Sequence, residues 1–102
     1  MAFQYKNSCN WVPDIPGFVV YILLLEDGRR YKGFTANFKN RMLAHFNGMG
    51  SYTTQKDKPI YILHYEVFQT KKEALDREQF FKSGYGYNWL RDNSHLFNTI
   101  KP

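Results

Sequence analysis

The stretch FVVYILLLEDGRRYKGFT, residues 18–35, decides the fold because it places two extended segments around one turn. Residues 18–25 are β-branched and aliphatic, and residues 31–35 resume an extended pattern. Asp27 and Gly28 lie between the two segments, and an Asp-Gly pair between apolar runs is a strong hairpin signal. The sequence therefore predicts an antiparallel hairpin here.

The length of the turn decides which side chains share a face of the hairpin. A two-residue loop would pair Leu24 with Tyr31 and place Tyr21 and Tyr31 on opposite faces. A three-residue loop with Gly28 in the left-handed conformation pairs Leu23 with Tyr31, so that the two tyrosines share one face. We predict the second register.

Two later helices have clear start signals. Asn37 is a favoured N-cap, and a helix is expected from about residue 38 to 46, with an apolar stripe along one side. Thr70 and Glu73 form a capping box, and the helix that they begin is expected to end near Lys82. The residues predicted on its buried side are Ala74, Leu75 and Phe81.

Turn residues outline the remaining segments. Residues 47–58 are polar and contain glycine, so they are interpreted as a mobile loop, and Pro59 is expected to open a strand to about residue 68. One or two short helices are expected in residues 85–102, where the predicted packing residues are Trp89, Leu90, Leu96, Phe97 and Ile100. Residues 1–16 are expected to be an irregular leader before a domain spanning residues 17–102.

Composition limits the class of protein. The chain has 102 residues, the size of one domain, and its 43% hydrophobic content can supply one packed core. No apolar run reaches the roughly 20 residues of a membrane-spanning helix, and no secretory pattern opens the chain. The single cysteine, Cys9, cannot form an internal disulfide, which favours a cytoplasmic location. A net charge of +5 favours polyanionic partners such as nucleic acid.

Glu78 is the first candidate for chemistry, because a carboxylate on the apolar side of a helix is costly when it lacks a partner. The structural explanation is an ion pair with Arg77, Lys82 or Arg41. The functional explanation is a magnesium site, since proteins often hold Mg²⁺ through one or two carboxylates and waters.

Arg41 and His45 are four residues apart and so lie together beside the apolar stripe of their helix. They are either a solvated helix edge, or a guanidinium that grips a phosphate with a histidine that assists proton transfer. Tyr21 and Tyr31 can be explained as ordinary strand residues. A catalytic role would require one of them to lose its proton near neutral pH, although an unperturbed tyrosine has a pKa near 10. Taken singly, none of these residues decides the function.

Taken in order, they resemble the GIY-YIG nuclease family. The matching segments are Val19-Val20-Tyr21, Tyr31-Lys32-Gly33, Arg41 with His45, and Glu78 within residues 73–78. The resemblance covers about residues 18–91 and is greatest to stand-alone members. Val19, Val20 and Lys32 replace the family's glycine and two isoleucines, which are mainly structural positions. Phe34 stands where the UvrC branch carries a lysine, so no lysine-assisted step is expected.

The resemblance implies an α/β fold of the α+β type, with a small three-stranded antiparallel sheet flanked by helices. It implies a divalent-metal-dependent endonuclease that hydrolyses a nucleic-acid phosphodiester, with DNA as the expected substrate. Tyr21, Tyr31, Arg41, His45 and Glu78 would be its catalytic residues, with Glu78 holding Mg²⁺ or Mn²⁺. A non-catalytic nucleic-acid-binding module and a protein-interaction domain are the alternatives. Target specificity would come from the domain's own loops, from a homodimer or from a partner protein.

Overall fold

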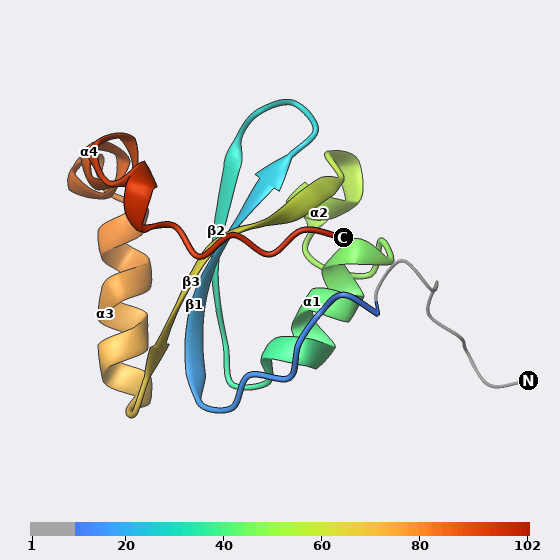
Figure 1. The fold of residues 1–102 in the computed structure, drawn as a ribbon, viewed down its shortest axis with the longest axis horizontal. Coiled ribbons are helices and arrows are strands. Elements are labelled where there is room, and N and C mark those ends of the chain that lie inside the picture. Colours follow the sequence, from blue (N-terminus) through green and yellow to red (C-terminus); the bar gives the residue numbers. More distant parts are fainter. Residues whose placement is uncertain (1–9) are drawn as a thin grey trace, which may run out of the picture.

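The computed structural model describes residues 10–102, so residues 1–9 of the predicted leader, including Cys9, lie outside the described residues. The fold has one three-stranded antiparallel sheet with helices on both of its faces (Figure 1). The strand order is β2-β1-β3, so the first strand of the chain lies in the centre. This is the α+β arrangement that the family resemblance implied.

The predicted hairpin register is confirmed. β1 (Phe18–Leu25) and β2 (Arg30–Thr35) pair Leu23 with Tyr31, and Gly28 has a φ of +89°. The amide of Leu25 donates to the carbonyl of Arg29 over 2.9 Å, which closes the turn. Tyr21 and Tyr31 therefore lie on the same face of the sheet, as expected from the three-residue loop.

The helices follow the cap residues closely. α1 (Phe38–Phe46) begins after Asn37, whose side chain accepts from the amide of Asn40 over 3.3 Å. α3 (Lys71–Phe81) begins at the predicted capping box, in which Thr70 accepts from the amide of Glu73 over 3.2 Å and donates to its carboxylate over 2.8 Å. β3 (Pro59–Phe68) matches the predicted strand, and α4 (Gly84–Asp92) and the 3₁₀ turn η2 (Ser94–Leu96) fill the C-terminal region.

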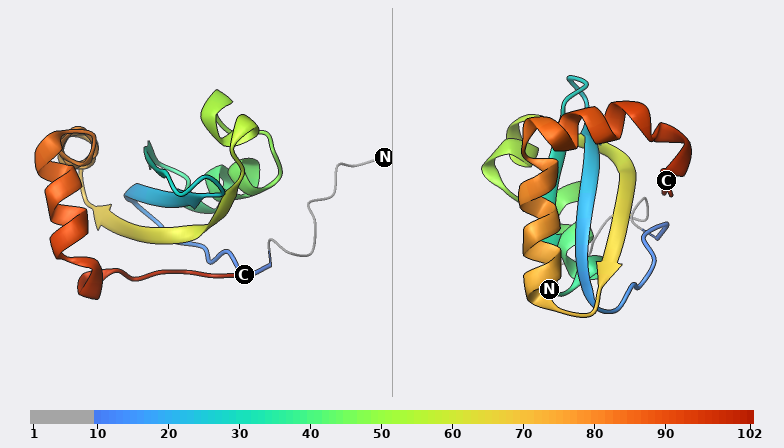
Figure 2. Two further views of the ribbon diagram at one scale, coloured as in Figure 1. Left: turned by 90° about the horizontal axis from the view of Figure 1, so that it is seen from above. Right: turned by 90° about the vertical axis from the view of Figure 1, so that its left-hand side faces the viewer.

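The sheet divides the core into two layers, as the views from above and from the side show (Figure 2). On one face, Phe38 and Met42 of α1 pack against the odd-numbered side chains of β1, together with Val12 from the chain before the sheet. On the other face, α3 and α4 cover Val20 and Ile22. Because strand side chains alternate, β1 supplies both layers and is buried along almost its whole length.

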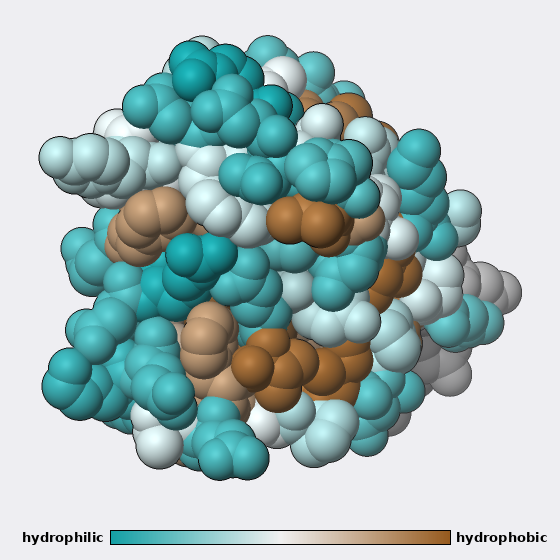
Figure 3. Space-filling model, turned by 60° about the vertical axis from the view of Figure 1, so that its left-hand side comes forward, coloured by the Kyte–Doolittle hydropathy of each residue, from teal (hydrophilic) through white to brown (hydrophobic). Residues whose placement is uncertain are grey.

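Two predicted packing residues lie at the surface instead. Leu75 is 36% exposed, because Ala74 and Phe81 already direct one side of α3 to the sheet and Leu75 lies a third of a turn away. Leu96 is also exposed, because Phe97, the residue that follows this turn, makes the contact with the core instead. On the side where α3 and α4 lie, hydrophilic side chains cover most of the surface and apolar ones show in separate patches (Figure 3). Scattered apolar residues of this kind need no partner.

The last residues lie along the outer edge of β3. Ile100 forms a bridge with Ile62, and the Asn98 side chain bonds to both the amide and the carbonyl of Tyr65, over 2.9 and 3.0 Å. This contact covers one edge of the sheet and leaves β2 as the other edge strand. None of the described helices is both long and apolar enough to span a bilayer.

Candidate active site

The Tyr21 ring can lie within the sheet because its neighbour on β2 is a glycine, which has no side chain. Its partner in the register is Gly33 on β2, and a β-carbon at position 33 would overlap Oη and Cζ of the phenol. The ring can therefore extend over the β2 backbone at Gly33, and its hydroxyl points toward α1 at the edge of the sheet. The side chain is 1% exposed, so this hydroxyl needs partners within the protein.

His45 of α1 supplies one partner and is itself 1% exposed. Its Nε2 lies 2.8 Å from the Tyr21 hydroxyl, and its Nδ1 lies 2.8 Å from the hydroxyl of Thr54. The sequence placed His45 beside the helix stripe with Arg41, yet the structure buries its ring. Burial is tolerated because both ring nitrogens have a partner.

The hydrogen-bond directions follow from Thr54. Its hydroxyl donates to the carbonyl of Ser51 over 3.2 Å, so its oxygen is available to accept from Nδ1–H of His45. In that tautomer Nε2 carries no proton and accepts a hydrogen bond from the Tyr21 hydroxyl. The three side chains thus form one directed chain from Tyr21 through His45 to Thr54.

The segment that supplies Thr54 was predicted to be a mobile loop, and this prediction is wrong. It contains the short helix α2 (Tyr52–Lys56), which Ser51 caps by accepting from the amide of Thr54 over 3.3 Å. Gly50 precedes it, and a β-carbon there would overlap Nδ1 of His45. A five-residue helix is unstable alone, so packing against His45 sustains it. Ser51 was the available sequence signal, as an N-cap three residues before Thr54.

Burial disfavours the charged forms of both titrating groups in this hydrogen-bond chain, Tyr21 and His45. Burial, with a smaller effect of the Arg41 charge, lowers the pKa of His45 to about 4. Burial also raises the pKa of Tyr21 to about 12, although its hydrogen bond from Arg41 opposes that rise. At neutral pH both side chains are therefore uncharged, and the Tyr21 hydroxyl retains the proton with which it donates a hydrogen bond to His45.

Arg41 is the cation of this group. Its Nε donates to the Tyr21 hydroxyl over 3.4 Å, a long bond, and this contact is the main cause that raises the pKa of Arg41. The side chain is half-buried, and no carboxylate in residues 10–102 forms an ion pair with it. Most of its donors therefore lack a charged acceptor, which is the condition for binding an anion.

Tyr31 completes the group on this face. Its ring centroid lies 6.4 Å from that of Tyr21 and 5.3 Å from that of His45. Unlike Tyr21 it is only half-buried, so water can approach it. The hairpin and α1 thus bring together four of the five residues predicted for the site: Tyr21, Tyr31, Arg41 and His45.

Glu78, the fifth, comes from α3 on the opposite face. Its side chain is 13% exposed, and Lys82 lies 3.4 Å from its carboxylate, so one of the structural partners foreseen for it is present. No hydrogen bond joins Glu78 to the other four residues within the described chain, but its charge is near enough to oppose the ionisation of Tyr21. Glu78 therefore lies near the group without a hydrogen bond to it.

Glu78 also fits the way in which proteins hold magnesium. The described residues contain no group of three or more histidine, cysteine, aspartate and glutamate side chains arranged for a metal ion. Mg²⁺ does not need such a cage, because one carboxylate with waters and a phosphate often suffices. Glu66, by contrast, is bound by Arg77 on both oxygens and by His64. Glu78 is the less encumbered of these two partly buried carboxylates.

Comparison with known proteins gives one family. The sequence profile of the GIY-YIG catalytic domain matches residues 17–90. A UPF0213 protein encoded in the ldhD 5′ region of Pediococcus acidilactici is 38% identical over 93 residues, which cover 86% of this chain and 95% of the relative. A UPF0213 protein of Bacillus pumilus is 32% identical over 77 residues, covering 76% and 74% of the two chains. No solved structure matches significantly.

Proposed function

The chain belongs to the GIY-YIG catalytic domain family, and from this premise we propose that it is a divalent-metal-dependent endonuclease acting on nucleic acid, with DNA as the expected substrate. The observation that carries the proposal is the Arg41 guanidinium, which lies beside two phenols and has no carboxylate partner in the described chain. A cation placed in this way is suited to a phosphate that arrives from outside. The net charge of +5 favours the same class of partner.

The reaction that these residues suit is hydrolysis by in-line attack of water on the phosphodiester. The water oxygen forms a bond to phosphorus, the bond to the leaving oxygen breaks, and the proton of the water passes to a base. Arg41 would neutralise the charge that develops on the phosphoryl oxygens. Glu78 would hold Mg²⁺ or Mn²⁺, which supplies Lewis-acid stabilisation of that charge when bound.

The two tyrosines have different roles in this proposal. Tyr31 is half-buried and can meet the attacking water, so we assign it the orientation and deprotonation of that water. For this step Tyr31 acts as its phenolate, which takes up the proton of the water. Tyr21 is buried and keeps its proton, so it is a positioning residue that holds Arg41 and is held by His45.

A cleavage panel tests the proposal. The purified protein is incubated with single-stranded, duplex and branched DNA and with RNA, each with Mg²⁺, with Mn²⁺ or with a chelator. We expect a metal-dependent cut that Tyr31→Phe nearly abolishes, while circular dichroism shows the variant folded. Salt-sensitive binding without cleavage of any substrate would instead identify a nucleic-acid-binding module. Absence of both would indicate a protein-interaction domain.

A further inference from the structure

A basic groove lies between the β1–β2 turn and α4, away from Tyr21 and Tyr31. Its volume is about 610 Å³, and its lining includes four cations, Arg29, Arg30, Lys32 and Arg91, but no carboxylate. Arg30 and Lys32 alternate with Tyr31 along β2, so they point to the face of the sheet opposite the phenol. The groove therefore lies on the face of the sheet opposite Tyr21, Tyr31 and Arg41, which is the face that α3 with Glu78 also covers.

Two of these cations lack a negatively charged partner among the described residues. In the described chain, Arg30 and Lys32 form no ion pair, and Arg30 has only the Phe97 ring, whose centroid is 6.0 Å away. Burial and, secondly, the charge of Arg30 lower the pKa of Lys32. A bound anion would relieve this repulsion, because it would compensate both charges at once.

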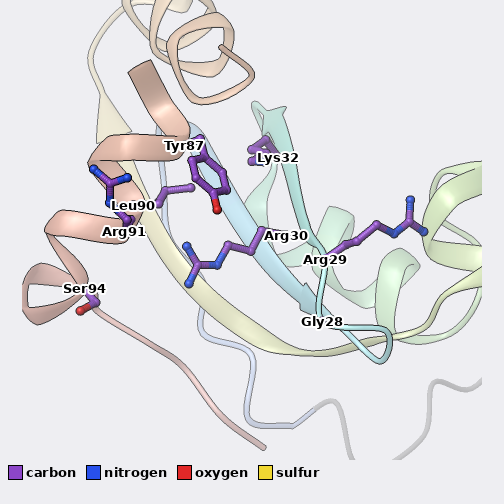
Figure 4. A pocket seen from close by; sticks show the side chains of 8 residues that line it. All are labelled: Gly28, Arg29, Arg30, Lys32, Tyr87, Leu90, Arg91 and Ser94. Atoms are coloured by element: carbon purple, nitrogen blue, oxygen red, sulfur yellow. The ribbon is translucent and has the colours of Figure 1, made fainter. Parts of the chain in front are cut away.

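The other two cations are already engaged. Arg29 is held by Asp27 and Asp57, and its side chain points away from the groove toward α2 (Figure 4). Arg91 pairs with the adjacent Asp92 over 2.8 Å at the surface, where such a pair contributes little. Arg30 and Lys32 are thus the principal anion contacts, and Arg91 can add a third at the rim.

An aromatic side chain stands over the same groove. Tyr87 of α4 is 66% exposed, and in Figure 4 its ring lies between the buried Leu90 and Lys32, with its hydroxyl toward Arg30. No ring or ion-pair contact fixes Tyr87 among the residues described, so its faces are open to a ligand. Exposed aromatic rings beside cations are the combination that binds unpaired bases and their phosphates.

We infer that this groove binds an unpaired strand of the nucleic acid that flanks the cleaved phosphate, with phosphates on Arg30 and Lys32 and a base on Tyr87. The inference rests on the proposed function for the class of ligand. A strand that leaves Arg41 must turn around the β2 edge to reach the opposite face. A single strand can make this turn, whereas duplex DNA stays nearly straight over about 150 base pairs.

Binding without metal tests the groove separately from cleavage. Fluorescence anisotropy in chelator measures the affinity for a blunt hairpin duplex, for the same duplex with an unpaired tail, and for single strands of DNA and RNA. We expect Arg30→Gln and Lys32→Gln each to weaken binding of the tail about tenfold and to reduce the salt slope by about 0.7. Comparison of the DNA and RNA strands shows which backbone the groove prefers.

Tyr87 separates stacking from charge. Tyr87→Ala should weaken tail binding about tenfold, Tyr87→Phe should retain it, and neither should alter binding of the blunt duplex. Lys71→Gln is the matched control, because Lys71 is exposed at the start of α3, at the far end of that helix from α4 (Figure 1). Equal binding by Tyr87→Ala and the wild type, or equal losses for tailed and blunt duplexes, would overturn the inference.

The two proposals can fail independently. A protein that binds tails through Arg30, Lys32 and Tyr87 but cuts nothing would contradict the nuclease and support the groove. A protein that cuts nucleic acid, but whose groove variants bind tails as tightly as Lys71→Gln does, would overturn the groove alone.

Discussion

Each face of the sheet holds a histidine and an arginine among aromatic rings, and the two groups differ in how their charges are balanced. On the α3 side, the guanidinium of Arg77 bonds both oxygens of Glu66, over 2.7 and 3.2 Å, and His64 reaches the same carboxylate over 2.9 Å. Arg77 also stacks on the rings of Phe80, Phe81 and Trp89, with centroids 4.6, 4.5 and 5.0 Å away. We call His64, Glu66 and Arg77 the closed cluster.

On the α1 side, Tyr21, Arg41 and His45 form what we call the open cluster. Its histidine bonds two neutral hydroxyls, and its arginine has phenols where Arg77 has a carboxylate. The difference teaches that burial and residue type do not identify a site: both clusters are partly or fully buried and contain similar residues. The open cluster differs because Arg41, beside Tyr31, has no carboxylate partner among the described residues, and for this reason we propose it as the place for a substrate.

The largest expected effect concerns the two carboxylates. Glu78→Ala should reduce cleavage to background while leaving the fold intact, because the proposed metal ligand is lost. Glu66→Ala should instead destabilise the protein by about 1–3 kcal/mol, since it leaves Arg77 and His64 without their acceptor. Urea unfolding and activity per folded molecule separate the two outcomes. Retained specific activity in Glu78→Ala would end the metal role.

The next effect concerns the two arginines. Arg41→Lys keeps the charge but loses the planar pair of donors that a phosphate accepts, so turnover should fall about a hundredfold or more. Arg77→Lys loses its two bonds to Glu66 and should lower the melting temperature with little change in turnover. Single-turnover rates, corrected for the folded fraction, provide the measurement. Near-normal turnover in Arg41→Lys would reduce Arg41 to a general electrostatic contribution.

A third effect is on stability rather than on turnover. The folded pKa of His45, about 4, lies below the ordinary value of 6.5, so the unfolded chain binds more protons between these values. The stability supplied by neutral His45 is complete above pH 6.5 and is lost as the pH falls toward 4, a change of about 3 kcal/mol. Chemical unfolding across this window should show the loss in the wild type and a smaller one in His45→Gln. Parallel profiles for the two proteins would contradict the buried neutral imidazole.

The smallest effect concerns the end of the hydrogen-bond chain. Thr54→Val keeps the shape of the side chain but removes the acceptor for Nδ1–H of His45, which should cost about 1–2 kcal/mol of stability. Without that acceptor His45 can adopt the other tautomer, so Tyr21 loses its hydrogen-bond direction and turnover should fall about tenfold. Thr54→Ser should restore both values, because serine retains the hydroxyl. Nitrogen NMR of the imidazole reports the tautomer directly.

Local signals account for most of the fold. The turn at Gly28 determined the hairpin register, and the caps Asn37 and Thr70 located two helices, because each depends on residues a few positions apart. α2 was missed because its stability depends on Thr54 meeting His45, a contact nine residues away that no local pattern specifies. Leu75 was misplaced because periodicity indicates an apolar side of α3 but not how much of it the sheet covers.

The candidate site was foreseen less completely. The order of Tyr21, Tyr31, Arg41, His45 and Glu78 suggested one site, and the resemblance supplied their roles. Thr54 was absent from that prediction, and the sequence also gave no means to tell the closed cluster from the open one. That distinction depends on which arginine meets a carboxylate, and tertiary contacts decide this.

Positions 21 and 33 are twelve residues apart in the chain, but the contact between Tyr21 and Gly33 makes the residue that fits at one position depend on the residue at the other. The space that its missing side chain leaves is occupied by the Tyr21 phenol, so one methyl group at position 33 would displace the hydroxyl. The displaced hydroxyl could no longer bond His45 or Arg41. A library that randomises both positions should therefore yield two separate populations of folded chains, one with glycine beside tyrosine and one with a side chain beside a smaller residue. Only the first population would keep the phenol in place, so the residue at position 33 would indicate whether a distant relative retains this site.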